Sequence, residues 1–232
     1  MQQAETPAHS PLPFGALKRF GLFGGSFDPI HVGHLSIAQQ IRTALKLEKI
    51  MLLPNAQPPH KNGASASAEE RLEMCRLAVF NMHGLECSDF ELTRGGVSYT
   101  VETARRVRAA YGPDAQIFFL IGSDSLADLP LWYEIKELLS LIDFAIAERR
   151  EAPIKDSLWT RLNSELGAEH VAKLKAGVVN IQRVDISSTE IRRLLAAGEK
   201  IPGYLRADVE AYIRKKGLYG APLKPKMTRR IF

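Results

Sequence analysis

Short apolar runs alternate with amphipathic segments along most of the chain. Runs of strand length that are apolar, or that alternate apolar with polar residues, predict strands at 20–23, 49–54, 85–92, 116–122, 143–150 and 177–184. Apolar residues at helical spacing predict helices near 31–45, 67–82, 100–111, from 132 onward, 187–198 and 206–220. Because parallel strands need helical crossovers, this alternation predicts an open, mostly parallel α/β sheet flanked by helices. Residues 151–176 are charged and irregular, with only some helical pattern.

The first predicted strand leads into a pattern typical of an anion site. Phe20–Phe23 is followed by Gly24 and Gly25, which let the backbone turn tightly and approach a ligand. A helix then opens near His31, so its amide groups and the positive end of its dipole point toward the glycines. His31 and His34 share one helical face and can both reach an anion there. A glycine pair alone is typical of a turn, and a lone histidine of a surface or core position, but the combination favours a phosphate site.

A second segment repeats this arrangement near the end of the chain. The last predicted strand runs into Ser187, Ser188 and Thr189 at a helix start, with Arg192 one turn inside the helix. Helix capping alone explains the serines. A strand that feeds hydroxyl groups into a helix N-terminus beside an arginine also has the chemistry of an anion site.

Length and composition fit one globular domain. The 232 residues are 45% hydrophobic, and we expect a domain at 17–220, a disordered Pro-, Ala- and Gln-rich extension at 1–16 and a basic tail at 221–232. No apolar run reaches the roughly 18 residues that a membrane span needs, and the N-terminus lacks the order of a signal peptide. We therefore expect a cytoplasmic protein with no membrane partner. Cys75 and Cys87 lack metal-type spacing and are predicted to be reduced and buried.

The charge balance does not favour a nucleic-acid partner. The net charge is +5, but the last twelve residues contain four basic residues and no acid, so the rest of the chain carries only +1. The basicity is therefore mainly that of a solvated tail. The sequence leaves open whether the chain forms a homo-oligomer.

Two motifs carry a resemblance to a known family. The sequences GGSFDPIHVGH at 24–34 and ISSTEIR at 186–192 resemble the nucleotidyltransferase superfamily with the HxGH signature. Within it, the longer form of the first motif is most similar to the bacterial nicotinate-nucleotide adenylyltransferases. The resemblance covers most of residues 18–220 and implies a Rossmann-like fold of the nucleotidyltransferase type. It implies transfer of the adenylyl group of ATP to nicotinate mononucleotide in NAD biosynthesis, with release of pyrophosphate and no covalent intermediate.

The resemblance also assigns roles at the phosphates. The catalytic residues would be His31, His34 and Arg192. The other ATP-binding residues would be Gly24, Gly25, Ser26, Phe27, Gly122, Asp124, Ser187, Ser188 and Thr189. Asp124 follows a central strand, at the sheet edge where ligands bind in such folds, and would hold a ribose hydroxyl. We expect Mg²⁺ to be carried on the ATP phosphates and water, and we predict no metal ligand from the protein.

The nicotinate mononucleotide site is assigned in the same way. The resemblance places Tyr99 and Thr100 at the nicotinate carboxylate and Trp132 on the pyridine face. By propensity alone Thr100 is a helix cap, and Trp132 is equally suited to the core or to stacking. His60 and Lys61 lie in a polar loop after the second strand and would bring positive charge to the phosphates. The plain alternative is a solvated loop.

Several other functions share parts of this pattern. Phosphopantetheine adenylyltransferase has a similar pair of motifs but is shorter, and a nicotinamide-preferring or dual enzyme stays open. The segment KMTRR at 226–230 faintly resembles the lysine loop of an ATP-dependent synthetase but lies in the tail. A dehydrogenase or a nucleotide-binding module would use the same kind of sheet, although GxGxxG is absent.

Overall fold

The computed structural model describes residues 17–56, 66–94, 99–149, 151–182 and 184–222. The predicted N-terminal extension at 1–16, most of the basic tail, and the loop residues His60 and Lys61 lie outside the described residues.

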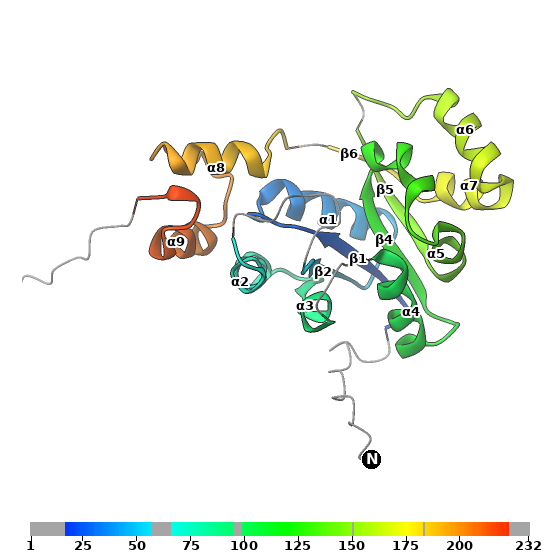
Figure 1. The fold of residues 1–232 in the computed structure, drawn as a ribbon, viewed down its shortest axis with the longest axis horizontal. Helices are drawn as coiled ribbons and strands as arrows, with labels where there is room; N and C mark the ends of the chain where they lie inside the picture. The colour runs from blue at the N-terminus through cyan, green and yellow to red at the C-terminus, as the bar shows by residue number, and fades with distance from the viewer. Residues whose placement is uncertain (1–16, 57–65, 95–98, 150, 183, 223–232) are drawn as a thin grey trace, which may run out of the picture.

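A single parallel sheet forms the centre of the molecule (Figure 1). Its six strands lie in the order β3-β2-β1-β4-β5-β6, and all five neighbouring pairs are parallel. The strands are β1 (Arg19–Gly25), β2 (Lys49–Pro54), β3 (Leu85–Cys87), β4 (Gln116–Gly122), β5 (Asp143–Arg149) and β6 (Val178–Ile181). The strand order reverses between β1 and β4, which is where ligands bind in open α/β sheets. The predicted fold class is confirmed.

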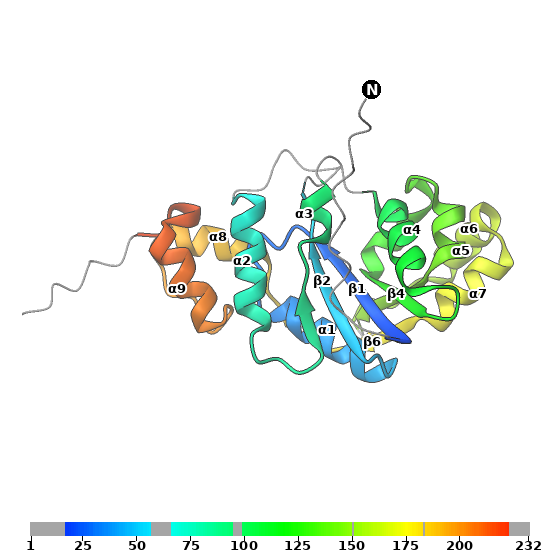
Figure 2. The same ribbon diagram turned by 90° about the horizontal axis from the view of Figure 1, so that it is seen from below.

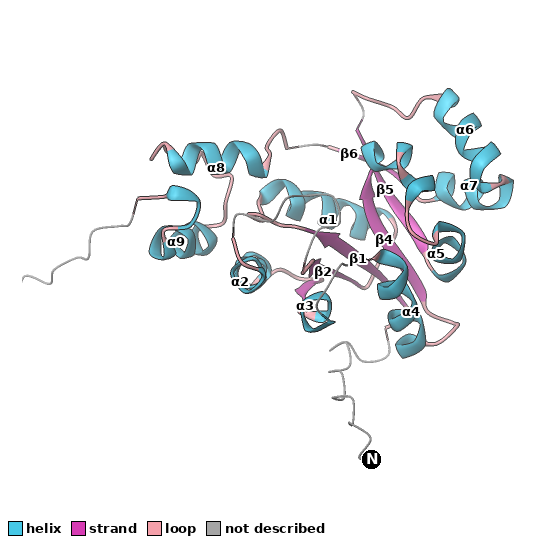
Figure 3. Ribbon diagram, viewed as in Figure 1, coloured by secondary structure: helices cyan, strands magenta, loops and turns pink. Residues whose placement is uncertain are grey.

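Helices cover both faces of the sheet (Figures 2 and 3). One apolar layer involves α1 (Val32–Ala44), α2 (Ala68–Val79), α8 (Ser188–Ala196) and α9 (Ala207–Lys216). The other involves α3 (Phe90–Arg94), α4 (Thr100–Tyr111), α5 (Ile135–Leu141), α6 (Asp156–Leu166) and α7 (Ala168–Ala176). Three short 3-10 turns complete the described elements: η1 (Ser123–Ala127), η2 (Leu129–Leu131) and η3 (Leu218–Gly220). In Figures 1 and 2, α8 and α9 lie at one end of the molecule, with α9 beside α2.

The structure corrects two predicted elements. The predicted strand at 85–92 ends at Cys87, because the buried Ser88 hydroxyl accepts a hydrogen bond from the Phe90 amide at 3.2 Å and starts α3 instead. The segment 151–176 is not irregular but holds α6 and α7, which pack through Leu162 and Leu174 and are separated at Gly167, where φ is 90°. A local side-chain hydrogen bond thus ends the strand in the first case, and a glycine with positive φ separates the two helices in the second.

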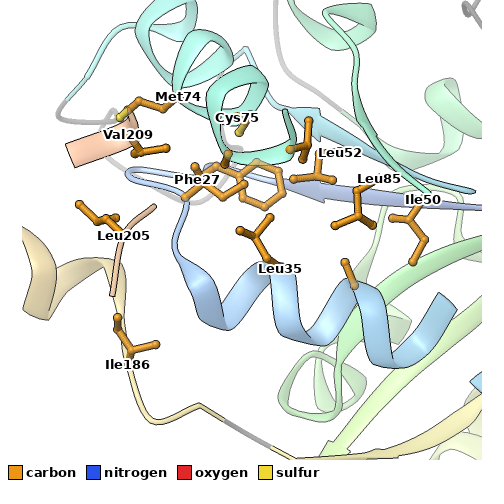
Figure 4. Close-up of a cluster of buried hydrophobic side chains, with 14 of the residues drawn as sticks. Phe27, Leu35, Ile50, Leu52, Met74, Cys75, Leu85, Ile186, Leu205 and Val209 are labelled. Carbon is orange, nitrogen blue, oxygen red and sulfur yellow. The ribbon is translucent and has the colours of Figure 1, made fainter. Parts of the chain in front are cut away.

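The apolar layer between α1 and α2 includes a residue from the first motif. Figure 4 shows the Phe27 ring between α2 and α1, close to Leu35. Phe27 as a whole residue is 2% exposed, so almost none of its ring or backbone is accessible to a ligand. Cys75 is buried in this layer and Cys87 is half-buried, and both are free thiols. The prediction of buried cysteines is thus confirmed for Cys75 and wrong for Cys87.

Among the helices of the described residues, none is long and apolar enough to span a membrane.

Candidate active site

Gly24 and Gly25 are the last two residues of β1 and not the expected turn, because the chain turns only after them, at residues 26–29. Residues 24–29 are called the glycine turn below. Neither glycine has room for a side chain. A Cβ atom at Gly24 would lie 2.9 Å from Cζ of Phe119, and one at Gly25 would lie 3.0 Å from Cζ of Phe27. Phe27 has a φ of 46°, a left-handed conformation that is uncommon for a bulky residue. Aromatic rings thus fill the space beside both glycines, so tight packing favours glycine at these two positions.

His31 and His34 are stacked at the start of α1. Their ring centroids are 3.7 Å apart with an interplanar angle of 24°. The backbone amide of His31, the N-cap residue, donates to Nδ1 of His34 at 3.3 Å, which places the proton of a neutral His34 ring on Nε2. His31 is 7% exposed, its Nδ1 has no hydrogen-bond partner among the described residues, and burial lowers its pKa to about 4. His31 is thus neutral at pH 7.

The amide groups at the start of α1 are less available than the sequence suggested. The Val32 amide donates to the Tyr204 carbonyl at 3.0 Å, and the His34 amide donates to the His31 carbonyl at 3.0 Å. The two imidazoles are therefore the polar groups that this end of α1 contributes, rather than a full set of free amides.

The second motif docks directly onto the first. Ser188 Oγ donates to the Pro29 carbonyl at 3.0 Å, and Arg192 Nη1 donates to the Asp28 carbonyl at 2.7 Å. Arg192 Nη2 also donates to the Thr189 hydroxyl at 3.3 Å. The sequence predicted two phosphate-binding segments at strand ends, and the fold brings them into contact.

Ser187 acts as a helix cap, as the propensity argument suggested. Its hydroxyl accepts a hydrogen bond from the Glu190 amide at 3.1 Å. Ser187 and Thr189 are exposed at the start of α8. A structural role for Ser187 does not prevent its neighbours from facing a ligand.

Arg71 was not predicted as a site residue, yet its guanidinium donates hydrogen bonds to the backbone in and next to the glycine turn. Arg71 is 1% exposed and donates to the Ser26 carbonyl and the Asn55 carbonyl, each at 2.8 Å. Burial lowers its pKa, and the negative charge of Asp28 acts in the opposite direction. The sequence did contain a sign of this burial: Arg71 is three residues before Met74 and four before Cys75, so it falls on the buried face of α2.

A cavity of about 560 Å³ opens where β1 and β4 end. It collects most of the residues predicted to bind nicotinate mononucleotide, together with the glycines of the turn. Its lining includes Gly24, Gly25, Tyr99, Thr100, Phe119, Gly122, Trp132 and Tyr133. The fold thus groups the predicted residues Tyr99, Thr100 and Trp132 beside the glycine turn.

The aromatic side chains of this cavity are held by ring contacts. Trp132 meets Phe119 and Phe144 edge-on, with centroid distances of 6.2 and 6.1 Å. It is half-buried and lies before α5, which begins at Ile135 because Glu134 has a left-handed φ of 50°. Trp132 therefore belongs to the edge of the core and to the cavity wall.

Thr100 is not the cap of α4. The N-cap residue is Tyr99, which makes no side-chain capping bond, and Thr100 is the first helical residue. The Tyr99 ring instead contacts Tyr133, with a centroid distance of 4.8 Å. Thr100 lies at the cavity wall.

Glu91 and Thr103 form a buried polar pair that sequence analysis also missed. Both line the cavity, Glu91 is 5% exposed, and the Thr103 hydroxyl donates to Glu91 Oε1. The second carboxylate oxygen of Glu91 has no hydrogen-bond partner among the described residues. The incorrect strand at 85–92 had hidden Glu91, since only the observed helix brings it to α4.

Asp124 lies apart from this cavity. Its side chain is 75% exposed, 4.0 Å from Arg149, and lines a second hollow of about 520 Å³ with Lys155 and Arg161. A Cβ atom at Gly122 would lie 2.3 Å from Oδ1 of Asp124. Gly122 faces the first cavity and Asp124 the second, so the end of β4 separates the two.

No cluster of three or more histidine, cysteine or acidic side chains that could hold a metal ion occurs within the described ranges.

Comparison with known proteins identifies similar chains. The sequence model of the cytidylyltransferase-like family matches residues 22–194. A protein from Gemmatimonas aurantiaca, named probable nicotinate-nucleotide adenylyltransferase, is 39% identical over 87% of this chain and 92% of its own length. A protein of the same name from Pseudomonas putida is 37% identical over 89% of this chain and 97% of its own length.

Solved structures share the fold. Plasmodium falciparum nicotinic acid mononucleotide adenylyltransferase complexed with NaAD has a TM-score of 0.70 and 23% identity, covering 89% of this chain and 100% of that one. The same enzyme complexed with APC has a TM-score of 0.68 and 22% identity.

Proposed function

The chain belongs to the cytidylyltransferase-like family and, within it, to the nicotinate-nucleotide adenylyltransferases, and on this basis we propose that it transfers the adenylyl group of ATP to nicotinate mononucleotide. The products are nicotinate adenine dinucleotide and pyrophosphate, and the reaction is a step of NAD biosynthesis. One observation carries the proposal: Ser188 and Arg192 dock on the histidine motif, beside a cavity of about 560 Å³ at the reversal point of the sheet.

The chemistry needs alignment of two anions rather than a protein nucleophile. An oxygen of the nicotinate mononucleotide phosphate attacks the α-phosphorus of ATP, and the bond from that phosphorus to the bridging oxygen breaks. The electron pair of that bond leaves with pyrophosphate. Because the attacking phosphate is already ionised at pH 7, no protein base and no covalent intermediate are required.

The protein supplies hydrogen-bond donors and positive charge at the triphosphate. His31, His34 and Arg192 face it from the two motifs, with the hydroxyls of Ser188 and Thr189 and the glycine turn beside them. His31 is neutral, so it acts as a dipole and a donor, whereas Arg192 brings a full charge. Mg²⁺ is carried on the ATP phosphates, where it neutralises part of their charge.

The cavity receives the nicotinate ring. Trp132 stacks on the pyridine face, and the hydroxyl and backbone groups of Tyr99 and Thr100 bind its carboxylate. A carboxylate accepts hydrogen bonds, whereas a carboxamide also needs an acceptor for its NH₂ group, so donors from Tyr99 and Thr100 favour the acid. As the resemblance implies, Asp124 would hold a ribose hydroxyl, and His60 and Lys61 would contribute positive charge for the phosphates.

Pyrophosphate release is the direct test. The purified protein is given Mg-ATP with nicotinate mononucleotide, nicotinamide mononucleotide or phosphopantetheine, each alone. Selective turnover of the nicotinate compound supports the proposal. Turnover of phosphopantetheine alone would retain the phosphate site but overturn the roles given to Tyr99, Thr100 and Trp132, and turnover of none would contradict the proposed reaction.

A further inference from the structure

The C-terminal turn of the described chain reaches back to the first motif. After α9 the chain turns at Gly217, where φ is 66°, and at Gly220, where φ is 72°. Between them Tyr219 has a φ of 57° and a ψ of 26°, a left-handed conformation that is costly for a bulky residue. A residue keeps such a backbone only where its surroundings hold it in place, and the Tyr219 side chain makes one of the contacts that do so.

The Tyr219 hydroxyl donates to a buried carboxylate in the histidine motif. It lies 2.7 Å from Oδ1 of Asp28, and the sulfur of Met74 is 4.0 Å from the same hydroxyl. Burial and the hydrogen bond to Asp28 raise the pKa of Tyr219, so its hydroxyl stays protonated and remains a donor. Figure 4 shows Met74 beside Val209 of α9, and Tyr219 packs against the apolar layer to which both belong.

Asp28 connects three segments that are far apart in the sequence. Its Oδ1 accepts hydrogen bonds from Tyr219 and from the Ala66 amide, the latter at 3.2 Å. Its backbone carbonyl accepts from Arg192 Nη1, while its Oδ2 remains 4.0 Å from that nitrogen. The Asp28 side chain is 8% exposed, so water does not compensate for a lost donor.

This geometry keeps the charge of Arg192 available. Because Tyr219 and Ala66 hold one carboxylate oxygen, the other forms only a long ion pair with Arg192, at 4.0 Å from Nη1. Without the tyrosine hydroxyl, Oδ1 keeps the Ala66 amide but loses the hydroxyl donor, and the carboxylate can turn toward the Arg192 guanidinium, which is already near Oδ2. A close pair with Asp28 would neutralise the charge that Arg192 presents to a phosphate.

We propose that Tyr219 is a positioning residue for the triphosphate site, which acts by fixing Asp28 so that Arg192 stays available to ATP. The inference rests on the proposed function, since it takes Arg192 as a phosphate-binding residue. It assigns the C-terminal turn a part in substrate binding in addition to its part in the fold.

The test compares Tyr219→Phe with Tyr212→Phe. Phenylalanine keeps the ring and removes only the hydroxyl. Tyr212 is a half-buried tyrosine of α9 that packs against the same apolar layer, so its variant controls for general effects on the core. Binding of a non-hydrolysable ATP analogue is measured by calorimetry, and kcat and the KM of each substrate by pyrophosphate release.

For Tyr219→Phe we expect about tenfold weaker binding of the ATP analogue, the size of one hydrogen bond to a charged group. The KM for nicotinate mononucleotide should change less than about twofold, because the cavity is not touched. Tyr212→Phe should bind the analogue as the unmodified protein does. A merely structural role would lower the melting temperature without separating the two substrates.

A second background isolates the charge of Asp28. In Asp28→Asn the residue cannot form an ion pair with Arg192, so adding Tyr219→Phe should weaken analogue binding by less than about twofold. The same tenfold loss in both backgrounds would overturn the inference. Equal analogue binding by Tyr219→Phe and the unmodified protein would also overturn it.

The two proposals fail differently. If the unmodified protein releases no pyrophosphate but Tyr219→Phe still weakens analogue binding tenfold, the reaction is wrong and the positioning role stands. If the unmodified protein turns over nicotinate mononucleotide and Tyr219→Phe binds the analogue normally, only the positioning role is wrong. Absence of analogue binding by the unmodified protein would overturn both.

Discussion

The two halves of the candidate active site are built by different forces. Around the histidine motif, side chains from α2, α8 and the C-terminal turn donate hydrogen bonds to Ser26, Asp28 and Pro29. In the cavity next to it, Trp132 and Phe119 are held mainly by edge-on ring contacts. The first half is fixed by buried polar bonds and the second by packing, although Glu91 and Thr103 are a polar exception in the second.

This difference determines how each half responds to substitution. A lost donor in the polar half leaves a buried acceptor unsatisfied, which is costly and changes geometry. A truncated ring in the packed half leaves space that neighbours or water can partly fill. We therefore expect larger effects in the polar half, and effects confined to one substrate in the cavity.

The largest effect is expected for His34→Ala. Loss of one preorganised donor at the reacting phosphates should lower kcat about 100-fold to 1,000-fold while the melting temperature changes little. The assay is pyrophosphate release with saturating substrates, with His170→Ala on α7 as a histidine control far along the chain. A His34→Ala enzyme within tenfold of the unmodified rate would contradict the catalytic role.

Arg71→Met should be the most destabilising change in the polar half. It leaves the Ser26 and Asn55 carbonyls without their donor, and we expect a loss of about 3 kcal/mol in the free energy of unfolding. Chemical denaturation measures it. The control is Arg76→Met on the same helix, an exposed arginine 3.4 Å from Asp89, which should cost less than about 1 kcal/mol. Equal losses for the two variants would show that Arg71 does not support the turn.

His31 should make stability depend on pH in a defined window. Burial lowers its folded pKa to about 4 from an unfolded value of 6.5, so between these values the unfolded chain binds a proton that the folded one does not. The free energy of unfolding should therefore fall by about 2 to 3 kcal/mol from pH 6.5 to pH 4, with no contribution from His31 above that window. The difference between the unmodified protein and His31→Asn isolates this from other groups. A difference that stays constant with pH would contradict a buried neutral imidazole.

Trp132→Ala should have the smallest effect and the most selective one. We expect binding of nicotinate mononucleotide to weaken about tenfold, since base–aromatic stacking contributes on the order of 1–3 kcal/mol, while ATP binding changes less than about twofold. Calorimetry with each nucleotide separates the two. Trp159→Ala on α6, which removes a half-buried tryptophan outside the cavity lining, serves as the control. If Trp132→Ala weakened the binding of both nucleotides equally, the proposed difference between the polar half and the packed half of the site would be contradicted.

Local sequence patterns predicted the strands and the two motifs well. β1, β2, β4 and β5 are continuous apolar runs, and the glycine turn followed by histidines is a contiguous signal. Both motifs were predicted as anion-binding segments at strand ends, but the direct contacts of Ser188 and Arg192 with the first motif were not predicted. The roles given to the site residues themselves remain predictions.

Partners that are distant in sequence could not be predicted. Arg71 and Ser26 are 45 residues apart, and Tyr219 and Asp28 are 191 residues apart, so no periodicity connects them. Glu91 was lost because the short polar segment around Ser88 ended a strand that apolar alternation had extended. Such contacts depend on tertiary packing, which single-sequence patterns do not encode.

The bond between Tyr219 and Asp28 also has a consequence for biosynthesis of the chain. A ribosome adds roughly 5–20 residues per second, so Tyr219 is made about 10 to 40 seconds after Asp28, given their separation of 191 residues. For most of that interval the histidine motif exists without Arg192, and for all of it without the tyrosine that completes its surroundings. A nascent chain therefore cannot form the full nucleotide site early, and the capacity to bind ATP arises only among the last events of its synthesis.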